Sequence, residues 1–153
     1  MQENNLLLGK FIRPTGKREF VKFKRIEATK PLEYLCWDIK YVWVQGERRN
    51  YYLLSVIDVY SPLRRTGKSL AWLFQSRIRQ IDLINLLRSL NLNHSLKGVV
   101  LRNDNGSQFI AHSVRKFLKH SEVKQEFTHV ATPEENSYID RGAGACLPQH
   151  FGT

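Results

Sequence analysis

The sequence predicts a mixed α/β domain, from the order and the period of its apolar stretches. Three short apolar runs come first, and two of them read as a hairpin. After them, stretches with helical spacing alternate with further apolar runs, which is typical of strands alternating with helices. The length of 153 residues suits one domain with a sizeable core. We therefore expect a five-stranded mixed sheet with flanking helices.

Each expected element rests on its own pattern. In residues 32–44, Cys36 and Asp38 fall on one face of a strand, and Trp37 and Ile39 fall on the other. A polar turn at 45–50 then joins this strand to the next as a hairpin. The expected strands span 32–44, 51–59, 69–74, 97–102 and 123–130, and the expected helices span about 79–91, about 110–120 and 134–140.

The ends of the chain read differently from its middle. Residues 1–31 are basic and irregular, so we interpret them as an arm or linker rather than as a core element. Residues 32–140 form the expected core domain. Residues 141–153 carry two glycines and a proline without any periodicity, and we expect this tail to be disordered.

The bulk composition favours a polyanionic partner. Lysine and arginine number 24 against 14 acidic residues, which gives a formal charge of +10. Such an excess favours nucleic acid, because each phosphate that is neutralised releases counterions. Cys36 and Cys146 offer neither a disulfide framework nor zinc-ligand spacing, which fits a reducing intracellular compartment. The first residues read as neither a signal peptide nor a membrane span, so we expect no membrane partner.

Two aspartates stand out within or just after apolar strands. Asp38 lies in the middle of the first strand, and Asp104 lies just past the fourth, before the turn at Asn105 and Gly106. Taken alone, Asp104 fits simple turn chemistry. A charge inside an apolar strand, however, needs a partner or a metal ion. If the two strands are neighbours, the carboxylates converge and can share divalent metal ions. Asp58 is a competing strand acid, which we interpret as structural.

Four stretches carry a resemblance to a known family. They are Trp37 to Val42, Val56 to Ser61, Asp104 to Phe109, and Thr132 to Ile139. Together they resemble the integrase-core transposases of bacterial insertion sequences, which belong to the retroviral-integrase superfamily with its Asp-Asp-Glu triad. Many members have 35 residues between the second and third acids, as this chain has between Asp104 and Asp140. The resemblance implies a ribonuclease H-like fold. It also implies that the basic arm at residues 1–31 is the remnant of an upstream DNA-binding region.

The resemblance also implies an activity and a site. Asp38 and Asp104 correspond to the first two catalytic metal ligands, and the third position falls on Asp140. The implied cofactor is Mg²⁺ or Mn²⁺ in a two-metal site, and the implied reaction is DNA strand cleavage and transfer in transposition. Implied partners are transposon-end and target DNA, a second copy, or an intact transposase. The implied location is the bacterial cytoplasm, with the protein on the nucleoid when it is bound to DNA.

The chain departs from the family around the third acid. Asp140 replaces glutamate, and Gly142 and Gly144 follow at once, where the family's helix continues. The connection at 61–69 is also longer than is usual in the family. We interpret the chain as a truncated or frameshifted copy with impaired activity. The alternatives are a fragment that binds DNA or inhibits a transposase without catalysis, and a general ribonuclease H-like nuclease.

Other polar and aromatic residues have competing interpretations. His129 is weighed between a contact at the site and a structural role, while Asn105 and Asn136 are candidate polar helpers. Glu134 and Glu135 read as charges at a helix N-terminus, although either could act as a ligand. Four basic residues read as a solvated face that touches phosphate: Arg115, Lys116, Lys119 and Lys124. Three tryptophans read as core residues rather than stacking platforms: Trp37, Trp43 and Trp72.

Overall fold

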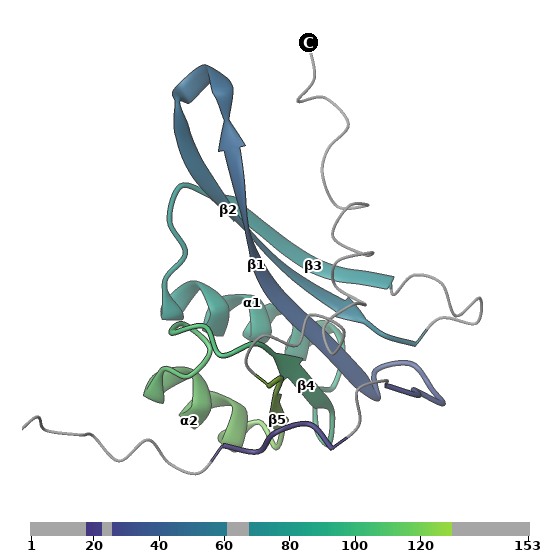
Figure 1. Ribbon diagram of the computed structural model, residues 1–153. Helices are drawn as coiled ribbons and strands as arrows, with labels where there is room; N and C mark the ends of the chain where they lie inside the picture. Colours follow the sequence, from purple (N-terminus) through teal and green to yellow (C-terminus); the bar gives the residue numbers. More distant parts are fainter. Residues whose placement is uncertain (1–17, 23–25, 61–67, 130–153) are drawn as a thin grey trace, which may run out of the picture.

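The computed structural model describes residues 18–22, 26–60 and 68–129, and these contain a five-stranded mixed sheet with helices on one face (Figure 1). The strand order in the sheet is β3-β2-β1-β4-β5, so β1 lies at the centre. In chain order the elements are β1 (Tyr34–Val44), the 3-10 turn η1 (Gln45–Glu47), β2 (Arg49–Asp58), β3 (Lys68–Gln75), α1 (Gln80–Asn93), β4 (Val100–Asn103), α2 (His112–His120) and β5 (Lys124–Phe127).

The hairpin of β1 and β2 is the longest feature of the sheet. The two strands pair antiparallel from Leu35 opposite Asp58 to Val44 opposite Arg49. The turn between them includes η1, and Arg48 adopts a left-handed backbone conformation with a φ of 53°. The tip of the hairpin reaches beyond the layer of helices (Figure 1). As a result, Tyr41 and Trp43 near this tip are exposed although they lie in a strand.

The second half of the fold brings β4 and β5 in parallel beside β1. Tyr34 to Cys36 of β1 pair with Val100 to Arg102, and β5 pairs in turn with β4. At the start of helix α1, the Arg79 backbone N–H donates to the Asp82 carboxylate at 2.7 Å, which is one half of a capping box. The connection from β1 to β4 includes α1, and the connection from β4 to β5 includes α2. A helix is the usual crossover between parallel strands.

The main core lies between the sheet and the two helices. It is built from alternate residues of the central strands, such as Leu35, Trp37 and Val56, packed against the inner faces of α1 and α2. A smaller cluster around Cys36 and Ile57 lies on the other face of the sheet. The predicted alternation in the first strand is confirmed, because Trp37 joins the first cluster and Cys36 joins the second.

Part of the predicted basic arm packs against the sheet. Phe20 forms a parallel bridge with Phe127, and the Val21 N–H donates to the Phe127 carbonyl at 3.0 Å. Val21 and Ile26 are both buried. Residues 18–22 therefore lie against the edge of β5, and Ile26 joins the smaller cluster around Cys36, although the many charges of this stretch suggested an arm apart from the core. The boundaries of the arm, core and tail stay predictions.

The expected strands and helices up to residue 129 are confirmed in kind and order, with shifts at their ends. The expected helix at 134–140 and the tail at 141–153 lie outside the described residues. The prediction that all three tryptophans are core residues is wrong for two of them. Trp37 is fully buried, whereas Trp43 is 60% and Trp72 is 51% exposed. Among the described helices, none is long and apolar enough to cross a membrane.

Candidate active site at the ends of strands β1 and β4

The strand pairing brings Asp38 and Asp104 to the same level of the sheet. The last registered pair between β1 and β4 is Cys36 with Arg102. Each aspartate lies two residues further along its own strand direction, and side chains two apart share a face of the sheet. Asp38 lies within β1 and Asp104 lies one residue past the end of β4, so the two acids follow the end of the parallel pairing on neighbouring strands. The two strands are neighbours, as the prediction requires, while the convergence of the two carboxylates and their metal-binding role stay predictions.

Asp38 lies over a buried part of the hairpin. It is directly opposite Ser55 of β2, and directly opposite residues of antiparallel strands point to the same face. Ser55 is fully buried, and its hydroxyl has no hydrogen-bond partner within the described part of the chain. A buried hydroxyl that faces the acid can donate to a carboxylate or to a molecule held beside it.

The loop after β4 holds Asp104 through its own backbone. The Gly106 N–H donates to Asp104 Oδ1 at 2.8 Å, and the Asn103 side-chain amide donates to the Asp104 carbonyl at 2.5 Å. A Cβ atom placed on Gly106 would lie 2.9 Å from Asp104 Oδ1 and 3.3 Å from the Phe109 ring. The absence of a side chain at residue 106 therefore allows the carboxylate to fold back onto the loop. The turn chemistry and a role for this acid as a ligand are compatible, because Oδ2 and further lone pairs remain.

Beneath the two acids, on the helix side of the sheet, a polar network fixes the same strand ends. Trp37 Nε1 donates to Asn103 Oδ1 at 3.0 Å, which joins the residue before Asp38 to the residue before Asp104. The Gln125 side-chain amide donates to the same Asn103 oxygen at 3.0 Å and to the Phe109 carbonyl at 3.1 Å. Asn103 is fully buried, so these bonds replace water that it cannot reach. They hold β1, β4 and β5 in register where the acids emerge.

The next residue, Asn105, connects this loop to the edge of the sheet. Its side-chain amide donates to the Thr128 carbonyl at 2.7 Å, and its oxygen accepts a hydrogen bond from Arg18 Nη1 at 3.1 Å. Beside it, His129 stacks on Phe20 with a ring separation of 5.3 Å. Asn105 thus supports the loop of Asp104, which is one form of the predicted helper role, and His129 makes at least one structural contact.

Cys36, Arg102 and Glu126 lie side by side in the register of β1, β4 and β5, two residues before the acids on β1 and β4. Arg102 pairs with Glu126 at 3.2 Å, with the two side chains 3% and 14% exposed. Arg102 also lies beside Cys36 in the register. Burial raises the pKa of the Cys36 thiol to about 12, and the carboxylates of Glu126 and Asp38 add to this shift, while Arg102 opposes it. The thiol is therefore neutral at physiological pH and acts as a small buried hydrophobe, as its place in the strand pattern predicts.

The competing acid, Asp58, has a structural role. It is buried, and its two oxygens accept hydrogen bonds from the backbone N–H groups of Leu32 at 2.9 Å and Tyr60 at 3.0 Å. Leu32 has a positive φ of 59°, so the carboxylate holds an unfavourable backbone conformation at the entry to β1. The prediction that Asp58 is structural is confirmed.

The donor set at the two strand ends fits a hard divalent cation. Mg²⁺ prefers carboxylate oxygens and keeps several waters, so two acids with a third from elsewhere suffice. Within residues 18–22, 26–60 and 68–129, no group of three potential metal ligands gathers. The predicted third ligand, Asp140, lies outside the described residues, as do the candidate helpers Glu134, Glu135 and Asn136.

Several supporting residues were not found from the sequence. Arg18 contacts the loop of Asp104 from 87 positions away in sequence, and Gln125 contacts Asn103 from 22 positions away. Ser55 lies opposite Asp38 on the neighbouring strand. A polar residue in an apolar strand is the signal that singles out Ser55, in the same way as it singled out Asp38. For Arg18 the only signal is the apolar pair Phe20 and Val21, which interrupts the basic stretch.

Comparison with known proteins identifies the fold. The integrase core domain family matches residues 28–133. The chain is similar to a chain of the simian T-cell lymphotropic virus intasome in complex with PP2A regulatory subunit B56 gamma. That match has a TM-score of 0.64 and 16% identity, and it covers 84% of this chain and 41% of that one. None of the curated proteins matches.

Two integrase catalytic core domains are also similar. The core of HTLV-2 integrase, solved in complex with magnesium in a dimeric form, has a TM-score of 0.58 and 16% identity, with coverage of 77% of this chain and 69% of that one. The core of BIV integrase has a TM-score of 0.53 and 13% identity, with coverage of 72% and 63%. The fold is therefore ribonuclease H-like, and this chain belongs to the integrase core domain family of the retroviral-integrase superfamily.

Proposed function

We propose that this chain is a catalytic-core fragment of a transposase that cuts and joins DNA with divalent metal ions. The observation that supports this most strongly is the pair of aspartates at the matched ends of β1 and β4, in a chain of the integrase core family. The charge of +10 supports DNA as the substrate. The insertion-sequence origin rests on the four sequence stretches described above.

In this proposal Asp38, Asp104 and Asp140 hold Mg²⁺ or Mn²⁺. The bound ions would stabilise charge on the attacking and leaving oxygens of the phosphodiester. The protein's own contribution is positioning. The Gly106 N–H fixes one oxygen of Asp104, and the bond from Trp37 to Asn103 keeps β1 and β4 in register one residue before each acid. Such preorganisation matters, because a misplacement of about 1 Å can cost on the order of a hundredfold in rate.

The activity of the chain as written is proposed to be impaired. An aspartate at position 140 has a reach roughly 1.5 Å shorter than that of glutamate. Gly142 and Gly144 each weaken a helix by about 1 kcal/mol relative to alanine. A short helix without good helix formers is marginal, so the third carboxylate would be poorly held.

A second candidate function is binding without catalysis. The same departures at residues 140–144 favour it, because they affect the third ligand and leave the basic residues intact. The fragment would then occupy DNA, or would join an intact transposase and poison it. The dimeric and intasome forms of the similar structures support self-association as part of either proposal. Either function places the protein in the bacterial cytoplasm, on DNA.

One assay separates the two candidates. The purified chain is incubated with Mg²⁺ or Mn²⁺ and a duplex that carries the ends of the DNA element surrounding its gene, and nicked and joined products are measured. Weak products that disappear in Asp38→Asn and in Asp104→Asn would support the catalytic proposal. Binding with no product in either metal would favour the inhibitory one. Cleavage of an RNA–DNA hybrid without a preference for ends would instead support a general nuclease.

A further inference from the structure

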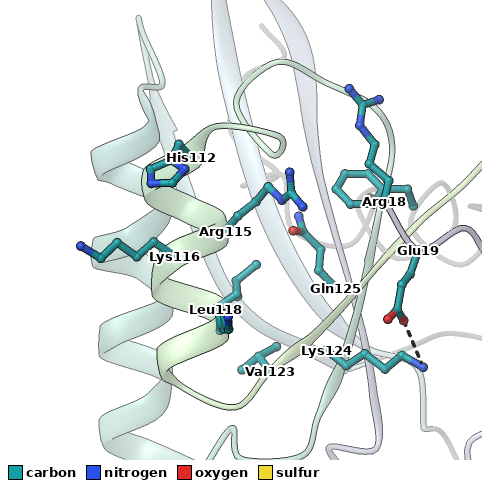
Figure 2. Close-up of a pocket in the computed structure, with 11 residues that line it drawn as sticks. Arg18, Glu19, His112, Arg115, Lys116, Leu118, Val123, Lys124 and Gln125 are labelled. Carbon is teal, nitrogen blue, oxygen red and sulfur yellow. Dashed lines mark ion pairs between the residues drawn. The ribbon is translucent and has the colours of Figure 1, made fainter. Parts of the chain in front are cut away.

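A basic groove lies between α2, β5 and the segment before β1, apart from the pair of acids (Figure 2). Its volume is about 770 Å³. Its floor includes Leu118, Val123 and Phe127, which are buried. Its rim carries five basic residues, namely Arg18, Arg115, Lys116, Lys119 and Lys124.

The charge of this groove is almost entirely of one sign. Glu19 is the one carboxylate among its lining residues, and it pairs with Lys124 at 3.3 Å. Figure 2 shows this ion pair on the side opposite α2, with Arg115 reaching from the helix toward Gln125 and Arg18. Positive side chains therefore approach the groove from both walls. A polyanion that lies between them can contact both sets at once.

The stability of α2 does not explain this arrangement. Lys119 lies in the last turn of the helix, where the helix dipole favours a cation. Arg115 and Lys116 lie earlier in the helix. Arg115 is four residues before Lys119, and like charges at this spacing destabilise a helix by a few tenths of a kcal/mol. In the described part of the chain, neither Lys116 nor Lys119 pairs with a carboxylate. Lys116 and Lys119 can therefore contact an anionic ligand in the groove.

One end of the groove is tied to the loop of Asp104. Arg18, which lines the groove, donates to Asn105 Oδ1 at 3.1 Å, and Asn105 follows Asp104 directly in sequence. Arg18 also lies over the Phe127 ring, 5.8 Å from its centre, so the floor holds its guanidinium in place. A ligand that follows the basic rim would thus arrive next to the acids.

We propose that this groove binds the phosphodiester backbone of double-stranded DNA and leads it toward Asp38 and Asp104. The inference rests on the proposed function, because it takes DNA as the partner and adds a place where the backbone lies. It assigns this contact to side-chain charges alone, so binding in the groove needs no divalent metal. We therefore expect the groove to bind DNA of any sequence, with an affinity that falls steeply as the salt concentration rises.

The test uses the full chain, a fluorescein-labelled duplex of arbitrary sequence, and EDTA. Affinity is measured by anisotropy between about 50 and 200 mM salt. The slope of log affinity against log salt concentration becomes shallower by about 0.9 for each phosphate that the protein no longer neutralises. The groove variant is Arg115→Gln with Lys124→Gln. The matched control, Arg48→Gln with Lys68→Gln, removes the same charge from the hairpin turn and from β3, away from the groove. Lys119→Gln with Lys124→Gln replaces the groove variant if the substitution of Arg115 impairs folding.

The groove variant is expected to lower the salt slope by about 2 and to weaken binding on the order of tenfold at the lower salt, while the control changes the slope little. Glu19→Gln is expected to tighten binding, because it removes the one acid of the groove. If the groove variant and the control lose affinity equally, the groove inference is wrong while DNA remains the partner. If the unmodified chain does not bind the duplex at all, both the inference and the proposed DNA substrate are wrong.

Discussion

At Gly106 the backbone and the Asp104 carboxylate are in direct contact, so this position tests the candidate site without removing an acid. Gly106→Ala would place a methyl group 2.9 Å from Asp104 Oδ1, which forces the carboxylate or the loop to move. We expect metal-dependent DNA cleavage to fall by up to about a hundredfold, since a shift of about 1 Å suffices for this. Product formation is measured at saturating Mg²⁺ or Mn²⁺.

The control for this change is Gly46→Ala in the hairpin turn, where an added Cβ meets no atom within 4 Å. Alanine there is expected to leave both cleavage and thermal stability nearly unchanged. The unfolding temperature of Gly106→Ala is measured beside it. A loss of activity that is matched by a general loss of structure would argue against a specific effect on Asp104.

Cys36 provides a pH-dependent test of burial at the residue scale. Its folded pKa of about 12 lies above the ordinary value of 9.0. Below pH 9 the thiol is protonated in both states and contributes no slope. Between pH 9 and about pH 12 the unfolded state releases the thiol proton and the folded state keeps it. The free energy of unfolding therefore falls by about 1.4 kcal/mol per pH unit in this range. We expect this loss in urea unfolding of a Cys146→Ala background relative to the same chain with Cys36→Ala. Parallel pH profiles of the two proteins would show that the thiol ionises in the folded state.

Residue patterns single out the two acids as candidates, but they do not indicate the residues that support them. Asp38 and Asp104 are visible because a charge within or at the end of an apolar strand requires an explanation. Asn103, which joins Trp37 and Gln125, has no such signal, because its partners are 66 and 22 residues away in sequence. Local spacing predicts which side chains share a face, but it does not predict which distant strand lies beside them.

At the scale of elements, the pair Arg102 and Glu126 links β4 to β5 inside the protein. Arg102→Met is expected to destabilise the fold by about 3–5 kcal/mol, because it leaves the Glu126 carboxylate without its buried partner. Combining it with Glu126→Gln should recover a large part of that loss. Urea unfolding of both variants and of Glu126→Gln alone measures the coupling.

The surface pair Lys97 and Glu122 is a matched comparison, since its separation of 3.0 Å is similar but its side chains are 70% and 62% exposed. Lys97→Met should change stability by no more than about 1 kcal/mol. Equal losses for Lys97→Met and Arg102→Met would mean that the burial of the inner pair has no energetic consequence.

The exposure of Trp43 shows where element patterns stop being informative. Alternation in β1 assigns Trp43 to the same face as Trp37, and this follows from the period of a strand. Whether a helix covers that face depends on the lengths of α1 and α2 relative to the hairpin. Because β1 and β2 extend past the helices, the side chains near the tip stay exposed (Figure 1).

At the scale of the whole molecule, the net charge predicts that DNA binding and catalysis can be separated. Asp38→Asn is expected to leave affinity unchanged or slightly higher, because it removes a negative charge near phosphate while the +10 balance remains. Cleavage should be lost. Anisotropy and product formation are measured on the same preparation. A large loss of affinity, with an unchanged unfolding temperature, would count against the assignment of Asp38 to the metal site.

Under the proposed function, strand transfer is expected to depend on residues 141–153 as well as on Asp140 itself. Asp140→Glu alone is expected to rescue strand transfer little, because Gly142 and Gly144 would still weaken a helix that follows. Replacing residues 141–153 with a helix-forming segment of the family's type should rescue it more. Robust strand transfer by the unmodified chain, abolished by Asp104→Asn, would show that this interpretation of the tail is wrong.

The hydrogen bond from the Trp37 indole to Asn103 gives the protein an internal optical reporter. Trp37 is fully buried and lies one residue before Asp38, whereas Trp43 and Trp72 are exposed. An aqueous quencher such as iodide should therefore suppress the emission of the two outer indoles and leave a blue-shifted component from the inner one. Titrating Mg²⁺ against that remaining emission is expected to follow metal occupancy beside Asp38 and Asp104 without an assay of cleavage.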